Sequence, residues 1–272
     1  MKKTVLYIAL STLVFTSCKK SVDDMTALDN TVKSALTLQF DNIAGGANVQ
    51  LNAGSYTNAL GESFSITMLQ YFISNVKLTT LDGTQYTVPQ DSSYFLVQES
   101  NAASQFCKMR VPLGEYKLVT FTIGVDSLRS TMNISKRTGV LDPSVLSHDD
   151  GGMYWGWNSG YIFYRMEGIS NLAPIDPAGL RKYRYHIGGF GGYSSPSLNN
   201  IKNITIDLTT NGTAKVREGR TSNIHIMADV LKMFTGTTNV SIAANPTVMF
   251  SDYSANIASN YVNMFRHDHT EN

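Results

Sequence analysis

Short runs in which apolar and polar residues alternate, separated by turn residues, constrain the fold of this chain most. Residues 36–40 alternate cleanly, and the strand-like run 71–78 is followed by Leu81-Asp82-Gly83-Thr84, which is typical of a hairpin turn. Further runs of this kind cover residues 94–97, 116–124, 161–167, 183–187, 201–208 and 223–228. No regular order of strand and helix repeats along the chain, so a parallel sheet is not expected. The pattern predicts an all-β protein with an antiparallel β-sandwich over residues 35–272.

Two short helices and one long loop interrupt this strand pattern. Asp229 is placed to cap a short turn over residues 230–234. A second helix, starting at Ser251 or Asp252, is predicted from apolar residues at helical spacing: Ile257, Ala258, Tyr261, Val262 and Phe265. The loop over residues 126–152 is too long for a simple hairpin, and long ordered loops in compact domains are often functional.

The N-terminus has the pattern of a bacterial export signal. Two lysines precede eleven mostly apolar residues, 5–15, a run too short to span a bilayer as a helix. Thr16-Ser17-Cys18 follows and resembles a lipobox, which implies cleavage before Cys18 and a lipid on that cysteine. An ordinary secretory signal peptide with an incidental cysteine is the alternative. Residues 1–17 are interpreted as a lipoprotein signal peptide and the polar residues 18–34 as a flexible tether.

The residues around Cys18 also indicate where the protein resides. Ser17-Cys18-Lys19-Lys20 is similar to the start of Bacteroidetes lipoproteins, and lysine rather than aspartate after the cysteine favours the outer membrane. We therefore expect a cell-envelope protein that is held to the membrane by its lipid. Its domain faces either the periplasm or the cell surface.

Charge and cysteine content exclude several classes of partner. Without the signal peptide the chain holds 20 basic and 21 acidic residues, so no basic face for nucleic acid is expected. No second apolar run reaches membrane-spanning length. If Cys18 carries a lipid, Cys107 is the only thiol left, and no intramolecular disulfide can form. We predict that Cys107 is a small core residue rather than a metal ligand.

Both tryptophans of the chain lie in one window of nine residues, Met153-Tyr154-Trp155-Gly156-Trp157-Asn158-Ser159-Gly160-Tyr161. If the window is a strand, Trp155 and Trp157 project to the same face. Two large rings on one face either fill a core or build a site. The long loop leads directly into this window, which favours a site.

The five histidines supply the metal-ligating chemistry of the chain. His148 stands five residues before the tryptophan window, and His186 is followed by glycines that allow another segment to approach closely. His267 and His269 form a His-x-His pair, which on an extended strand presents both imidazoles to one side and suits copper or zinc. Alternatively, the pair belongs to a frayed tail and His148 is solvated. His225, in an apolar strand, is interpreted as a hydrogen-bonded structural residue.

Catalytic signatures are missing from the sequence. It contains no His-Glu-x-x-His, no Gly-x-Ser-x-Gly and no Cys-x-x-Cys. The acidic residues of the long loop give no reason to place two carboxylates across a cleft, as a glycosidase requires. We therefore do not expect the protein to be an enzyme.

Several segments match one known family in the same order. The tryptophan window, which continues to Ile162-Phe163 and closes with Glu167-Gly168, carries the most specific match. Weaker matches are residues 71–78, Gly124-Val125-Asp126-Ser127 with Asn133, Tyr185-His186-Ile187-Gly188-Gly189, residues 229–234 and residues 260–267. Together these segments resemble the MbnP-like family of copper-binding proteins, and the resemblance covers about residues 36–269.

The resemblance implies a β-sandwich that binds copper through histidines and a kynurenine formed from tryptophan. The residues it implies are Trp155 or Trp157 as the oxidised residue, His186 as a ligand, His148 as a second ligand, and His267 and His269 as competing ligands. An aromatic lining is expected from Tyr154, Tyr161 and Tyr185. The implied oxidant is a partner di-haem enzyme of the cytochrome c peroxidase type, MbnH. The protein itself then sequesters or delivers copper.

A second class of function fits the same residues. In a surface-exposed binding or adhesion module the tryptophans stack on a glycan or contact a protein, and the histidines are incidental. In a third interpretation both tryptophans only pack a core. Stabilisation of the folded protein by copper would separate the metal hypothesis from the other two.

Overall fold

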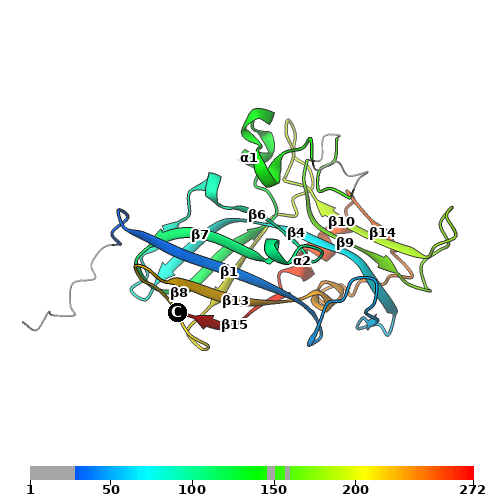
Figure 1. The fold of residues 1–272 in the computed structure, drawn as a ribbon. Helices are drawn as coiled ribbons and strands as arrows, with labels where there is room; N and C mark the ends of the chain where they lie inside the picture. Colours follow the sequence, from blue (N-terminus) through cyan, green and yellow to red (C-terminus); the bar gives the residue numbers. More distant parts are fainter. Residues whose placement is uncertain (1–27, 146–150, 157–159) are drawn as a thin grey trace, which may run out of the picture.

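Two β-sheets form the body of the protein. The computed structural model describes residues 28–145, 151–156 and 160–272, and Figure 1 shows the arrangement of its elements. The five-stranded sheet consists of β1 (Lys33–Ala44), β2 (Ala47–Asn48), β7 (Phe106–Pro112), β13 (Thr221–Asp229) and β15 (Phe265–Glu271). The ten-stranded sheet consists of β3 (Tyr56–Thr57), β4 (Ser63–Thr80), β5 (Gln85–Thr87), β6 (Tyr94–Gln98), β8 (Gly114–Ile123), β9 (Ile162–Ile169), β10 (Lys182–Gly188), β11 (Lys202–Asp207), β12 (Ala214–Val216) and β14 (Thr247–Val248). Each strand run predicted from the sequence overlaps one of these strands, but β1 and β4 extend well beyond the runs predicted at residues 36–40 and 71–78.

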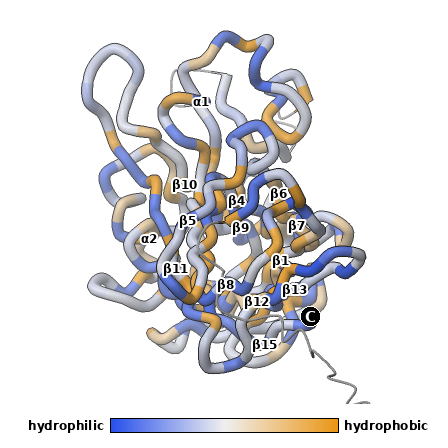
Figure 2. Tube along the Cα trace, turned by 90° about the vertical axis from the view of Figure 1, so that its left-hand side faces the viewer, coloured by the Kyte–Doolittle hydropathy of each residue, from blue (hydrophilic) through white to orange (hydrophobic). Residues whose placement is uncertain are grey.

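Alternation along the strands places one set of side chains between the two sheets. Leu36, Leu38 and Phe40 of β1 are fully buried. The ring of Phe40 packs edge-on against Tyr71 of β4 and Phe121 of β8, at centroid distances of 6.2 and 5.5 Å. Burying such a ring contributes about 1.5–3 kcal/mol. These contacts join the two sheets and confirm the predicted all-β sandwich; Figure 2 shows hydrophobic and hydrophilic positions interspersed along its strands.

The antiparallel arrangement predicted from the sequence is wrong for two pairs of strands. β1 pairs with β13 in parallel, with Phe40 opposite Ile226, and β10 pairs with β14 in parallel. Parallel neighbours need a long connection. The chain between β1 and β13 supplies one, because it builds most of the ten-stranded sheet on the way. A run of alternating residues does not specify a pairing partner so far away in the sequence. Both sheets therefore contain parallel as well as antiparallel pairs of strands.

The helices are short and lie near the predicted places. Val230–Phe234 forms a 3₁₀ turn, and the side chain of Asp229 accepts a hydrogen bond from the N–H of Leu231, as expected of a cap. α2 spans Ser254–Tyr261, so it starts after Asp252 and ends before Phe265. Phe265 instead begins β15, where its ring reaches Phe40 in the core at 6.0 Å. The apolar spacing that predicted a longer helix therefore combines a helix face with one strand residue.

The predictions for the N-terminus fall mostly outside the described residues. The signal peptide, residues 1–17, and Cys18 are not among them, and the predicted tether is described only from Leu28 onward. β1 already begins at Lys33, two residues before the predicted start of the domain. Within the described ranges, no helix combines the length and the apolar character needed to cross a membrane.

Cys107 is a core residue, as predicted. It lies on β7 opposite Leu38 of β1 and is fully buried. Burial raises the pKa of its thiol well above the ordinary value, because the thiolate has no solvation there. Since the thiolate is the reactive form, the native protein protects this sulfur.

We therefore expect Cys107 to resist thiol reagents in the folded protein. Labelling with a chromogenic disulfide reagent should be slow in native buffer and complete after unfolding in guanidinium chloride. The protein lacking residues 1–18 makes the measurement specific, because Cys107 is then its only thiol. Rapid stoichiometric labelling of the native protein would contradict the buried position.

Candidate functional site

The segment between β8 and β9 covers the outer face of the ten-stranded sheet. Gln70 of β4 donates a hydrogen bond to the carbonyl of Gly151 at 2.6 Å, and Arg165 of β9 donates one to the carbonyl of Gly152 at 2.6 Å. Gln70 and Arg165 are opposite each other in the pairing of β4 with β9. Two long polar side chains on one face of the sheet thus hold the backbone that leads into the tryptophan window.

The predicted long loop is built from short helical turns. α1 (Ser127–Thr131) is followed by 3₁₀ turns over Ile134–Lys136 and Gly139–Leu141. Asp126 caps α1 by accepting from the N–H of Arg129, and also accepts hydrogen bonds from Tyr94 and Asn75. Burial acts to raise the pKa of Asp126, but these hydrogen bonds outweigh it and lower the pKa below its ordinary value. A charged Asp126 therefore ties the start of the segment to the sheet.

Trp155 lies under this segment, against β10. Its side chain is only 2 % exposed, and its N–H donates a backbone hydrogen bond to the carbonyl of Gly160 at 3.0 Å. The indole occupies the space beside Gly188: a methyl group on that glycine would lie 2.7 Å from Trp155 Cζ3. The ring of Phe250 packs edge-on at 6.3 Å. The glycine after His186 thus allows the close approach predicted for it, and the segment that approaches is the tryptophan window.

His186 stands two residues before Gly188 on β10, in a buried ionic cluster. Its side chain is 1 % exposed, and Nε2 lies 2.8 Å from Oε1 of Glu167 on β9. The guanidinium of Arg165 contacts the same oxygen through Nε at 2.8 Å and Nη2 at 2.6 Å. Burial acts to raise the pKa of Glu167, but the hydrogen bond from His186 and the charge of Arg165 lower the pKa to about 2. Glu167 is therefore a carboxylate throughout the physiological range.

Alternate residues of a strand share a face, so His186 and Gly188 lie about 7 Å apart on the same side of β10. Because Trp155 packs on Gly188, the tryptophan window meets β10 two residues from His186. Arg165 and Glu167 were not predicted as site residues. Their signal in the sequence is a charged pair at alternate positions in the otherwise apolar strand Ile162–Ile169.

Two of the three predicted lining tyrosines, Tyr154 and Tyr161, pair with each other at an isolated bridge. The rings of Tyr154 and Tyr161 pack at 5.0 Å, and the guanidinium of Arg137 lies 5.6 Å from the centre of the Tyr154 ring. Burial raises the pKa of Tyr161 to about 12, so its hydroxyl stays protonated and donates to the carbonyl of Leu141 at 2.6 Å.

The prediction for Tyr185 is wrong. This residue precedes His186 and so projects to the opposite face of β10, where its ring packs on Tyr183 at 5.4 Å and on Phe234 at 6.0 Å. It belongs to the packing on the far side of the strand and cannot line a site on the face of His186.

The C-terminal histidines are ordered on β15 but do not share a face. His267 pairs with Ile226 and is buried, with Nε2 at 2.9 Å from the Thr270 hydroxyl, whereas His269 pairs with His225 and is exposed. A bulge at Asp268 separates them, so the prediction that both imidazoles project to one side is wrong. The alternative prediction of a frayed tail is also wrong, because β15 pairs with β13. Because β15 belongs to the five-stranded sheet, neither histidine joins His186. His148 and Trp157 lie outside the described residues.

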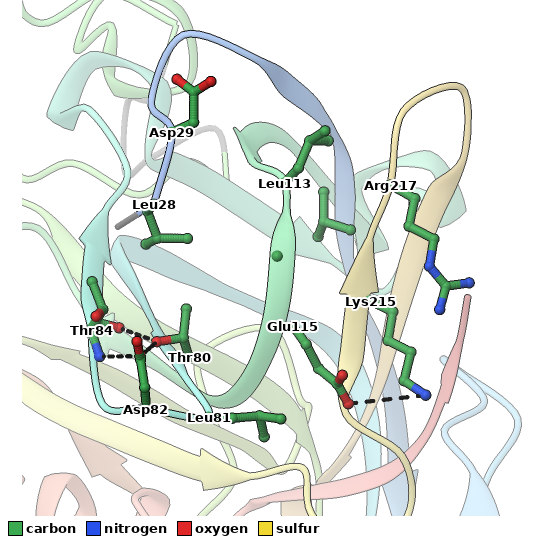
Figure 3. A pocket seen from close by; sticks show the side chains of 12 residues that line it. Leu28, Asp29, Thr80, Leu81, Asp82, Thr84, Leu113, Glu115, Lys215 and Arg217 are labelled. Atoms are coloured by element: carbon green, nitrogen blue, oxygen red, sulfur yellow. Dashed lines mark hydrogen bonds and ion pairs between the residues drawn. The ribbon is translucent and has the colours of Figure 1, made fainter. Parts of the chain in front are cut away.

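A cavity of about 590 Å³ lies elsewhere, beside Leu28 at the start of the described chain (Figure 3). Its lining is apolar at Leu28, Leu81, Leu113 and Val216 and charged at Asp29, Asp82, Glu115, Lys215 and Arg217. Glu115 and Lys215 face each other across 4.0 Å. None of the residues predicted for the site lines this cavity.

Fold and site together define an all-β sandwich protein in which an aromatic segment lies over a buried histidine, glutamate and arginine cluster. The family model MbnP matches residues 33–250. The chain therefore belongs to the MbnP family, which confirms the family predicted from the tryptophan window.

A solved structure agrees with this assignment at the level of the fold. MbnP from Methylosinus trichosporium is similar over 81 % of this chain and 82 % of its own, with a TM-score of 0.51 and 15 % sequence identity. At that identity the likeness concerns the fold alone. Among curated proteins, no sequence matches this chain.

Proposed function

We propose that the protein is a cell-envelope lipoprotein that binds copper on the outer face of its ten-stranded sheet, with His186 as one ligand. The observation that carries the proposal is the contact of His186 Nε2 with Glu167, whose carboxylate Arg165 holds in turn. Histidines that bind metals usually donate their second ring N–H to a carboxylate, which fixes the ring and strengthens it as a ligand. Nδ1 of His186 is then the nitrogen that coordinates the ion, and imidazole nitrogen suits copper.

The remaining ligands come from residues that family membership and the sequence suggest. An intact indole N–H is only a donor, so a tryptophan must be oxidised before it can coordinate copper, for example to kynurenine. A partner di-haem enzyme of the MbnH type is the oxidant we propose. Because Trp155 is only 2 % exposed, such an enzyme must oxidise it without direct contact with its ring. Trp157 is the alternative residue that the enzyme would oxidise.

His148 is the proposed second histidine. It precedes Gly151, whose carbonyl Gln70 holds, by three residues in the sequence. The aromatic residues of the tryptophan window would exclude water and protect a reduced ion. The protein then sequesters or delivers copper without turnover of its own.

The adhesion module is less well supported by the geometry. A tryptophan that stacks on a sugar must expose a ring face, and Trp155 exposes almost none. We further propose that a lipid on Cys18 anchors the domain to the outer membrane.

Copper retention and the mass of the tryptophan peptide test the proposed function. The chain is produced with and without the di-haem enzyme from its native host, and bound copper is measured after dialysis. We expect a kynurenine-containing peptide, and copper bound at the kynurenine site, only when the enzyme is present. In His186→Gln, copper retention at the kynurenine site should fall at least about tenfold, and Glu167→Gln should show a loss of about 10–100-fold at that site because it disturbs the orientation of the ligand.

The matched control is His225→Gln, which removes a histidine from the other sheet and should leave copper retention at the kynurenine site unchanged. Unmodified tryptophans and no copper after exposure to the enzyme would exclude the proposal. Full retention by His186→Gln would exclude His186 as a ligand.

A further inference from the structure

A second group of metal-ligating side chains lies on the outer face of the five-stranded sheet. His225 of β13 is opposite Gln39 of β1 and His269 of β15, while Ile226 is opposite His267. Asp268 is the extra residue of the bulge. The bulge changes the alternation of β15, so that His269 turns outward and lies beside His225. Figure 1 shows β15 next to β13 at the C-terminus.

The three side chains converge on one point. Oδ2 of Asp268 lies 3.0 Å from Nδ1 of His225 and 2.8 Å from Nδ1 of His269. The centroids of the two imidazole rings are 4.8 Å apart. One ligand atom from each of the three residues falls within 4.8 Å of the other two. In a tetrahedral site with ligands at about 2.0–2.1 Å from the ion, neighbouring ligands are about 3.3 Å apart, so only small movements are needed.

The charges around the group favour a cation. Asp41 of β1 lies 3.8 Å from Nε2 of His225, and Glu271 lies 3.7 Å from Nε2 of His269. With Asp268 they make three carboxylates, and among the described residues they are opposed by the guanidinium of Arg266 at 3.7 Å from Asp268. The His269 side chain is 49 % exposed, so an ion can reach the group from solvent.

We propose that His225, Asp268 and His269 bind one divalent transition-metal ion, Cu²⁺ or Zn²⁺, at a second site. Two imidazoles and a carboxylate are ligands of borderline softness that suit both ions, and copper binds such a set more tightly than zinc. Water or Asp41 completes the coordination. On binding, the Nδ1 protons now shared with Asp268 leave to solvent or move to Nε2, since an imidazole coordinates only through an unprotonated nitrogen.

This site is independent of the copper site proposed above. It lies on the other sheet, and it requires neither an oxidised tryptophan nor a partner enzyme. Asp268 and His269 also lie beyond residue 250, where the match to the family model ends. The site is therefore inferred from this chain's own C-terminal strand, and it can be present whether or not the tryptophan window binds copper.

The test is a titration of the unmodified protein, produced without the di-haem enzyme, with ZnCl₂ and with CuCl₂ by calorimetry. We expect one ion per chain, with copper tighter than zinc and no binding of MgCl₂ at the same concentrations. His269→Gln and His225→Gln should each weaken zinc binding at least about tenfold, which corresponds to about 1.4 kcal/mol. Zinc binding should also weaken as the pH falls from 7.5 to 5.5, because protons compete for the imidazoles.

The matched controls are His267→Gln, on the same strand but facing inward, and His186→Gln, in the other site. Both should bind zinc as the unaltered protein does, with circular dichroism confirming that each is folded. His269 is at the surface, so its variant is expected to fold normally. Zinc binding by His269→Gln that equals that of the unaltered protein would overturn the proposal, as would loss of zinc binding in His186→Gln alone.

Discussion

Replacement of Gly188 by alanine is expected to destabilise the protein by about 2–3 kcal/mol and to displace Trp155. A methyl group at this position would lie 2.4 Å from the carbonyl oxygen of Tyr161 and 2.7 Å from Cζ3 of Trp155. The first contact is with backbone and cannot be relieved by a rotamer change. The tryptophan window must therefore move away from β10, which also separates it from His186. Urea unfolding measures the loss of stability, and the tryptophan emission spectrum reports exposure of the ring.

Gly156→Ala is the matched control, one residue after Trp155. A methyl group there meets no heavy atom of the described residues within 4 Å. The change in stability should stay within about 0.5 kcal/mol, as for other surface substitutions. Equal unfolding midpoints for the two alanine variants would show that the tryptophan window is not packed on β10 as described.

The strands of this fold could be predicted because their signal is local. Residues 36–40 alternate, and the same residues bury Leu36, Leu38 and Phe40 in the core. The Asp229 cap is equally local, since the side chain bonds to the N–H two residues on. The parallel pairing of β1 with β13 could not be predicted, because it depends on how the intervening chain folds and not on either strand alone.

Like the fold, the candidate site could be predicted from the sequence only in part. The tryptophan window and His186 were found from residue types and a resemblance, and the structure brings Trp155 and His186 to one face of β10. The error at Tyr185 was avoidable, since Tyr183, Tyr185 and Ile187 alternate with His186 and mark the other face. The bulge at Asp268 could not be predicted from the sequence, because the register of β15 is set by its pairing with β13. His225 was interpreted as a hydrogen-bonded structural residue because its strand is apolar, and its Nδ1 does lie 3.0 Å from Oδ2 of Asp268. Its place beside His269 depends on the bulge and could not be predicted.

Arg165→Met is expected to cost about 2–3 kcal/mol at neutral pH and to move acid unfolding to higher pH. The side chains of Arg165 and Glu167 are only 7 % and 18 % exposed, so the variant leaves a largely buried carboxylate with His186 as its main remaining partner among the described residues. Removing one partner of a buried ion pair is costly because the other charge stays desolvated. The variant should also retain less copper, since Glu167 would no longer be held against His186.

The direction of the pH effect follows from Glu167. Its pKa is about 2 in the folded protein, because hydrogen bonding to His186 and the charge of Arg165 outweigh burial, and it is near 4.3 in an unfolded chain. The stabilisation is therefore complete above about pH 4.3 and is lost as the pH falls toward 2. Without Arg165 the folded pKa rises, so less stabilisation is available and the unfolding midpoint in an acid titration moves upward.

Arg184→Met on the neighbouring strand β10 provides the comparison for this prediction. Its guanidinium is 32 % exposed and lies 3.5 Å from Asp176, a looser pair nearer to solvent. Such pairs contribute about 0–1 kcal/mol, so this variant should unfold nearly as the unaltered protein does at pH 7 and at pH 4. Urea unfolding at both pH values measures the two variants side by side. If Arg165→Met is no more costly than Arg184→Met, the buried cluster does not hold His186 in place, and the histidine loses its main support as a copper ligand.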